Sequence, residues 1–143
     1  MAFELVPDHS AFQGGSIGQA YNEAAFRYFL DVDRTRLQHS ERSLVLALVS
    51  LRREAGRSAP IGDASAETLF AAIAGCVREV DFIGWYRQDR IIGAVLPQGD
   101  RAFVEGRSLI SDRLVASLKP CLPADMAQHL HVRVLRLSGK AQR

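Results

Sequence analysis

The side chains in this sequence best suited to bind an anion are its arginines. All but two of its 18 basic residues are arginine, and the planar guanidinium can donate two parallel hydrogen bonds to a phosphate or a carboxylate. Arg52 and Arg53 directly follow an apolar segment, and Arg87 and Arg90 flank a polar turn. Both pairs are candidate anion-binding residues. Alternatively they only solvate two loops, and the sequence leaves both interpretations open.

Other site chemistries have little support in the sequence. His129 and His131 have a spacing that can bind a metal on one face of a strand, but no carboxylate or third imidazole lies nearby. Cys76 and Cys121 belong to neither a CxxC nor a Cys/His zinc pattern. No motif for Ser/His/Asp or Cys/His catalysis is present. We therefore predict no metal site and no cofactor.

The bulk properties are those of one soluble domain. The chain has 143 residues, 48% of them hydrophobic and 24% charged, as in ordinary globular proteins. A net charge of +2 is too small to indicate a nucleic-acid partner. The N-terminus has no signal-peptide pattern, and the longest apolar run, Leu44 to Val49, is far below the roughly 20 residues that span a bilayer. We predict a cytoplasmic protein without membrane insertion.

Hydrophobic periodicity predicts the elements that position these side chains. A first helix begins at a Ser16 N-cap and ends near Ser40. The continuous apolar run Ser43 to Leu51 predicts a strand covered on both faces. A second helix begins at about Ser65 and carries an apolar stripe. The first strand therefore lies between two helices.

The second half of the chain predicts a hairpin, a helix and a last strand. The hairpin turns near Gln88 and Asp89, the helix covers about Asp100 to Leu118, and the strand covers His129 to Leu137. This order predicts an α+β fold, a split βαβ sandwich of the ferredoxin-like kind, with an antiparallel sheet, helices on one face and an extra N-terminal helix. Residues 1–15 are expected to form a flexible lead-in, residues 16–137 the domain and residues 138–143 a polar tail.

Four segments together resemble the GGDEF family, whose members synthesise cyclic di-GMP on a nucleotidyl-cyclase-like fold. Residues 21–26, YNEAAF, resemble the family's YNRRxF segment with both arginines replaced. An Arg-containing stretch leads into the apolar first strand, and residues 78–81, REVD, resemble an RxxD element. Residues 81–86 and 91–97 resemble the strands around the GGDEF turn. The resemblance covers about residues 16–137 and implies a signalling role.

The chain departs from the family at the positions that carry catalysis. The turn that should read GGDEF falls on residues 87–92, RQDRII, which lack its glycines and offer only Asp89 as a carboxylate. The first strand ends without an acidic residue before Glu54. Two-metal phosphoryl transfer requires oxygen ligands for Mg²⁺. We therefore predict no catalytic residues and no diguanylate cyclase activity, although an enzyme using unusual residues on this fold stays open.

The resemblance implies a ligand site at Arg78 and Asp81, because RxxD binds cyclic di-GMP in the family. A guanidinium can donate to guanine O6 and N7, while a carboxylate accepts from the opposite edge of the base. Alternatively, Arg78 caps the C-terminal end of the second helix and Asp81 begins a strand. Both interpretations remain open.

The leading hypothesis is a non-catalytic regulatory module that senses cyclic di-GMP and controls a partner protein, linked to surface polysaccharide or biofilm. The alternative is a protein-interaction or scaffold module without a small ligand. The partner protein is not identified by the sequence. The apolar stripe of Tyr21, Phe29 and Val32 is expected to pack within the domain, with weak homodimerisation as a secondary expectation.

Overall fold

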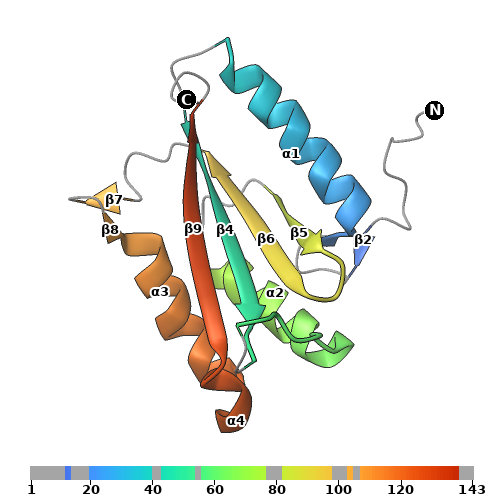
Figure 1. The fold of residues 1–143 in the computed structure, drawn as a ribbon, viewed down its shortest axis with the longest axis vertical. Helices are drawn as coiled ribbons and strands as arrows, with labels where there is room; N and C mark the ends of the chain where they lie inside the picture. Colours follow the sequence, from blue (N-terminus) through green and yellow to red (C-terminus); the bar gives the residue numbers. More distant parts are fainter. Residues whose placement is uncertain are drawn as a thin grey trace.

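The computed structural model describes residues 12–13, 20–39, 43–53, 56–76, 82–97, 103–104 and 107–138. Its main sheet has six strands with helices on both faces (Figure 1). In spatial order these strands are β2 (Phe12–Gln13), β3 (Ala20–Tyr21), β5 (Phe82–Arg87), β6 (Ile91–Pro97), β4 (Ser43–Leu51) and β9 (Leu130–Ser138). The helices are α1 (Glu23–Leu37), α2 (Asp63–Cys76), α3 (Leu109–Leu118) and the short α4 (Ala124–Ala127), with a 3-10 turn at Lys119–Cys121.

The four long strands have the predicted ferredoxin-like order. β5, β6, β4 and β9 lie side by side, and each neighbouring pair is antiparallel. The β4–α2–β5 unit leaves a place in the sheet that β6 fills, and the β6–α3–β9 unit leaves a place that β4 fills. This is the split βαβ arrangement. The α+β prediction is confirmed.

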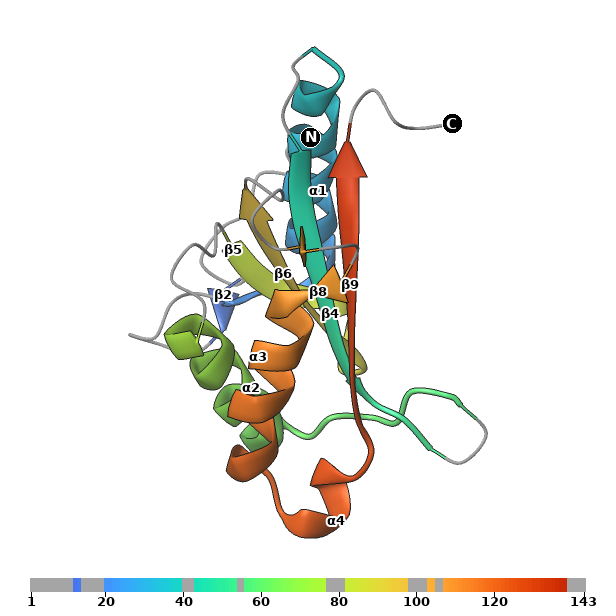
Figure 2. The same ribbon diagram turned by 90° about the vertical axis from the view of Figure 1, so that its left-hand side faces the viewer.

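The apolar run of β4 is continuous because both faces of this strand are covered. Val45, Ala47 and Val49 belong to the core under α2 and α3, whereas Leu44 and Leu46 belong to a second core under α1. Figure 2 shows the sheet nearly edge-on, with α2 and α3 together on one side. The prediction of helices on one face therefore holds for α2 and α3, while α1 packs on the opposite face. Within the described residues, no helix has the length and apolarity needed to cross a membrane.

The start of the first helix was predicted incorrectly. α1 begins at Glu23, and the extended residue Asn22 is its N-cap, with its side-chain oxygen accepting from the Ala25 N–H at 2.9 Å. Ala20–Tyr21 instead form β3, which pairs in parallel with β5. Apolar spacing that continues from a strand into a helix concealed this boundary. Ser16 lies outside the described residues.

The third helix is also shorter than predicted. It begins at Leu109, because Phe103–Val104 (β7) and Arg107–Ser108 (β8) pair as a small antiparallel hairpin. The sequence between these strands is Glu-Gly, and glycine favours turns. The hairpin signal was therefore present but was outweighed by the helical spacing around it.

The other elements lie close to their predicted positions. β4 has the predicted bounds, α2 begins at Asp63, and the β5–β6 hairpin turns at residues 88–90 as expected. Phe12–Gln13, inside the predicted lead-in, form β2, and Ser138, the first residue of the predicted tail, ends β9. The remaining residues of both segments lie outside the described part of the chain.

Two facing glycines determine how closely α1 and β3 approach the sheet. Gly84 and Gly93 are cross-strand partners on the α1 face. A Cβ at Gly93 would lie 2.6 Å from Cζ of Phe26, and a Cβ at Gly84 would lie 2.5 Å from the Tyr21 carbonyl oxygen. Phe26 is fully buried. The absence of two side chains therefore creates the space that the Phe26 ring and the β3 backbone occupy.

Candidate functional site

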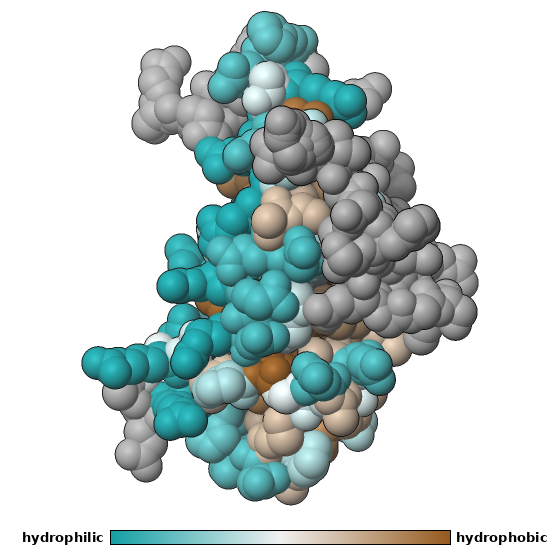
Figure 3. All heavy atoms as spheres, turned by 90° about the vertical axis from the view of Figure 1, so that its right-hand side faces the viewer, coloured by the Kyte–Doolittle hydropathy of each residue, from teal (hydrophilic) through white to brown (hydrophobic). Residues whose placement is uncertain are grey.

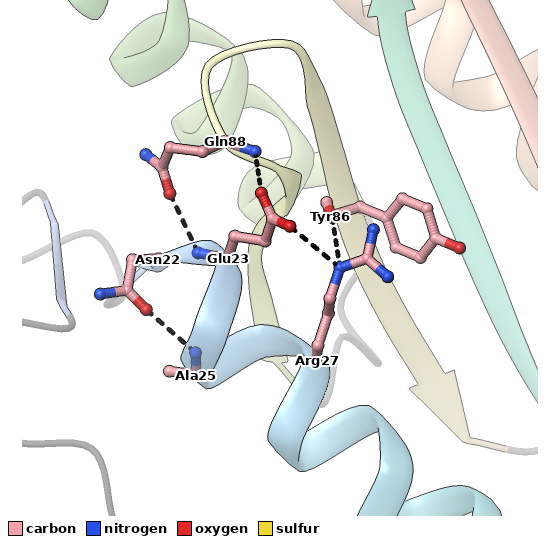
Figure 4. Close-up of polar contacts among 6 residues, drawn as sticks. All are labelled: Asn22, Glu23, Ala25, Arg27, Tyr86 and Gln88. Carbon is pink, nitrogen blue, oxygen red and sulfur yellow. Dashed lines mark hydrogen bonds and ion pairs between the residues drawn. The ribbon is translucent and has the colours of Figure 1, made fainter. Parts of the chain in front are cut away.

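The tip of the β5–β6 hairpin is joined to the start of α1 by a reciprocal pair of hydrogen bonds (Figure 4). The Gln88 backbone N–H donates to the Glu23 carboxylate at 2.7 Å, and the Glu23 backbone N–H donates to the Gln88 side-chain oxygen at 3.0 Å. Glu23 occupies the first turn of α1, where negative charge is favourable. Each residue therefore satisfies a backbone donor of the other element.

Arg27, one turn further along α1, reinforces this connection. Its Nε donates to the Tyr86 carbonyl oxygen at 2.9 Å and lies 3.3 Å from the Glu23 carboxylate. Its guanidinium carbon lies 4.4 Å from the centroid of the Tyr86 ring, within cation–π distance. We call Glu23, Arg27, Tyr86 and Gln88 the tip clamp.

The remaining residues of the hairpin tip contact the segment that follows β4. Asp89 has a φ of 64°, a left-handed conformation that Asp adopts more readily than most residues, and its carbonyl oxygen accepts from the Ile61 N–H at 2.7 Å. Arg90 Nη1 donates to the Ser58 carbonyl oxygen at 2.8 Å. The tip is thus held on one side by α1 and on the other by residues 58–61.

A pocket of about 540 Å³ lies at the end of β4, and Figure 2 shows the chain projecting from the sheet in this region. It is formed by the end of β4, the returning segment before α2, and the turn between α4 and β9. The lining residues are Leu51, Arg52, Arg53, Ala59, Pro60, Met126 and His129. We call this hollow the β4-end pocket.

Backbone hydrogen bonds connect the three walls of the β4-end pocket. The Arg52 N–H donates to the His129 carbonyl oxygen at 2.8 Å, which joins β4 to the turn before β9. The Ala59 N–H donates to the Leu51 carbonyl oxygen at 2.6 Å, and the Arg53 N–H donates to the Arg57 carbonyl oxygen at 2.8 Å. These bonds fold the segment after β4 back onto the strand. The pocket walls are therefore positioned by regular backbone pairing.

The β4-end pocket carries positive charge. Arg52 and Arg53 are both exposed, and within the described residues neither forms an ion pair with a carboxylate. The pKa of the nearby His131 is lowered, first by burial and then by the positive charges of Arg52 and Arg133. Unneutralised guanidiniums beside an apolar wall can hold an anion that carries an apolar group.

The four arginines that the sequence suggests as anion-binding residues do not all lie at one site. Arg52 and Arg53 line one pocket, whereas Arg90 bonds to the adjoining loop and Arg87 is exposed at the end of β5 without lining the pocket. Arg78 and Asp81, the candidate cyclic di-GMP residues, lie outside the described residues.

The sequence did not lead to the tip clamp, nor to His129 as a neighbour of Arg52. His129 was considered only as a metal ligand within a strand, but it lies in the turn before β9. Only the pairing of β9 with β4 brings it to Arg52. In the described part of the chain, no three His, Cys, Asp or Glu side chains cluster as a metal site would require. Glu23 could have been noticed in the sequence, because it replaces an arginine of the YNRRxF segment that residues 21–26 resemble.

Figure 3 views the molecule from the right-hand side of Figure 1, the side on which α1 lies. The described surface seen there is mainly hydrophilic, with small hydrophobic areas. The expected self-packing of the apolar stripe is confirmed for Phe29, whose ring centroid lies 5.0 Å from that of Tyr21 and 5.9 Å from that of Phe82. Homodimerisation stays a prediction.

Comparison with known proteins gives a distant likeness to a solved structure. No protein-family model matches the chain, and no curated protein matches it. Among solved structures, the chain is similar to the FimX GGDEF domain from Pseudomonas aeruginosa, at 19% sequence identity and a TM-score of 0.47. The similarity covers 90% of this chain and 82% of that domain. A likeness of this size assigns neither a family nor an activity to the chain.

Proposed function

We propose that this chain is a non-catalytic, GGDEF-like regulatory module that acts in the cytoplasm. The tip clamp carries the proposal. The hairpin turn that would hold the catalytic motif in the resembling family is here bonded to α1 through Gln88 and Glu23. Its Asp89 and Arg90 contact the segment after β4. These contacts give Gln88, Asp89 and Arg90 a role in holding the fold, which supports a module without catalysis.

The end of β4 also favours a role without catalysis. The strand ends in Val49, the buried Ser50 and Leu51, followed by Arg52 and Arg53. Guanidiniums repel a divalent cation, and no carboxylate of β4 could offset that repulsion. Phosphoryl transfer with two metal ions depends on such carboxylates.

The catalytic part of the proposal is tested by incubating the purified protein with GTP and Mg²⁺ or Mn²⁺. We expect no cyclic di-GMP and no hydrolysis products above a protein-free control. Turnover that copurifies with the protein and is lost in a Glu23→Ala, Gln88→Ala double variant would contradict it. That result would instead support an enzyme with unusual residues.

The ligand part of the proposal is cyclic di-GMP sensing through Arg78 and Asp81, and it rests on the sequence resemblance alone. Isothermal titration should detect binding to the native protein and none to Arg78→Ala. Arg34→Ala, which changes an exposed arginine on α1, is the matched control and should bind as the native protein does. Absence of heat at high micromolar ligand would favour the scaffold alternative, in which a partner protein is bound without any nucleotide.

The output of the module is proposed to be control of a partner protein, in the regulation of surface polysaccharide or biofilm. Deleting the coding sequence should change the amount of exopolysaccharide. A copy with Arg78→Ala should fail to restore it if ligand sensing is needed, whereas restoration by that copy would support the scaffold alternative.

A further inference from the structure

The β4-end pocket combines a cationic rim with an apolar wall. None of its lining residues belongs to the tip clamp. We propose that it binds a phosphorylated small molecule with an apolar ring system, the chemical class to which nucleotides belong. Arg52 and Arg53 hold the phosphate, and the apolar residues of the pocket contact the ring. This site is separate from Arg78 and Asp81, so it does not depend on cyclic di-GMP sensing.

The cationic rim suits a phosphate. Arg52 and Arg53 both line the pocket, and two guanidiniums match the two negative charges of a phosphate monoester. Neither side chain pairs with a carboxylate within the described residues, so an incoming phosphate displaces no ion pair there. His129 lines the same pocket and supplies an imidazole that can donate a further hydrogen bond.

The wall opposite this charge suits a ring. Leu51 is buried, Ala59 is half-buried, and Pro60 and Met126 complete the apolar lining. Methionine adapts its shape and contacts aromatic rings favourably through its sulfur. A volume of about 540 Å³ lies within the range of small-molecule sites. One ring system and its phosphate would fill such a space.

An acidic peptide is a poorer fit than a small molecule. A peptide that added a strand here would need free backbone donors at the pocket. The Arg52, Arg53 and Ala59 N–H groups already donate to His129, Arg57 and Leu51 carbonyl oxygens. The same bonds hold the walls in place before a ligand arrives, which lowers the cost of ordering them on binding.

The protein itself provides a reporter for this pocket. It contains two methionines, and Met126 lines the pocket. With ¹³C-methyl-labelled methionine, a Met126→Leu variant assigns the methyl signal that comes from the pocket. Titration with AMP and with GMP should shift the Met126 signal and saturate. Adenosine alone and inorganic phosphate alone should each bind more weakly, because each lacks one half of the ligand.

Variants locate the binding. Arg52→Ala and Arg53→Ala should each weaken nucleotide binding about tenfold or more, since each removes a charge-assisted hydrogen bond. Arg52→Lys keeps the charge but loses the planar fork, and should fall between the native protein and Arg52→Ala. Arg34→Ala, at an exposed position on α1, should bind nucleotide as tightly as the native protein does. Unchanged spectra outside the pocket would show that each variant is folded.

Three results would overturn the proposal. The first is no shift of the Met126 signal with either nucleotide at millimolar concentration. The second is binding that Arg78→Ala abolishes and Arg52→Ala leaves intact, which would place the nucleotide at the RxxD element. The third is saturation by an acidic peptide but by neither nucleotide. Conversely, AMP binding with no response to cyclic di-GMP would support this pocket while contradicting the ligand part of the proposed function.

Discussion

The tip clamp and the β4-end pocket lie at the same end of the sheet, yet their charged groups are used in opposite ways. In the clamp, Glu23 and Arg27 contact each other and two backbone groups of the hairpin. In the pocket, Arg52 and Arg53 project from the end of a strand without an ion pair among the described residues. Charges with partners define structure, whereas charges without partners are available to a ligand. This difference separates a structural role from a binding role within one small domain.

The largest loss of stability should come from a substitution in the core beneath the tip clamp, and it should leave the β4-end pocket unaffected. Phe26→Ala removes a fully buried ring that anchors α1 on the sheet, and we expect a loss of about 3–5 kcal/mol in the free energy of unfolding. Urea denaturation followed by circular dichroism measures this loss. At temperatures where the variant is folded, its nucleotide binding should match that of the native protein. A loss below about 1 kcal/mol would mean that α1 contributes little to the fold.

A smaller loss is expected from the clamp itself. Glu23→Ala leaves the Gln88 N–H without its acceptor and should reduce stability by about 1 kcal/mol, because the bond is charge-assisted but partly exposed. Glu23→Gln keeps an oxygen acceptor and should recover part of the loss. Denaturation midpoints of the two variants give the comparison. If Glu23→Gln is as unstable as Glu23→Ala, the carboxylate charge matters more than the hydrogen bond.

Arg27→Lys tests the stacking contact within the clamp. Lysine keeps the positive charge near Glu23 but loses the guanidinium plane over Tyr86. The expected cost is about 0.5 kcal/mol, typical of an exposed cation–π pair. In a Tyr86→Leu background the same substitution should cost less, and an equal cost in both backgrounds would assign the effect to the hydrogen bond with the Tyr86 carbonyl oxygen.

Near the β4-end pocket, the titration of His131 should make the stability of the protein depend on pH. Burial, Arg52 and Arg133 lower the pKa of His131 in the folded protein, so the unfolded chain takes up the proton first as the pH falls. This contribution to stability is therefore complete above the ordinary histidine pKa of 6.5 and is lost as the pH drops toward the lower folded value. Denaturation midpoints at pH 7.5 and pH 5.5 should differ less in His131→Gln than in the native protein.

The same histidine also reports on the charge of the pocket. Arg133→Gln should raise the pKa of His131, as measured by NMR, because it removes one of the two positive charges. A bound nucleotide should raise it as well, by neutralising Arg52. A pKa of His131 that does not respond to nucleotide would mean that the phosphate lies away from Arg52.

The sequence predicts the four long strands of the sheet well, because such strands and their hairpin leave local signals, whereas β2 and β3 were not predicted. The apolar run of β4 and the polar turn at Gln88 and Asp89 each mark one element. The start of α1 was misplaced, since Ala20 and Tyr21 fit helical spacing as well as they fit a strand. The pocket was predictable only in part. Arg52 and Arg53 could be singled out, but His129 and Met126 reach them through the pairing of β4 with β9, which no local pattern encodes.

The facing glycines Gly84 and Gly93 make the residue type allowed on the sheet depend on the residue type present on α1. Because the ring of Phe26 occupies the volume that a side chain at position 93 would need, a larger residue at 93 requires a smaller one at 26. Any descendant of this sequence with alanine at 93 should carry a smaller residue at 26. The two substitutions made together should restore much of the stability that either one removes. Position 26 on α1 and position 93 on β6 should therefore change together during evolution. An alignment of enough related sequences should show this co-variation.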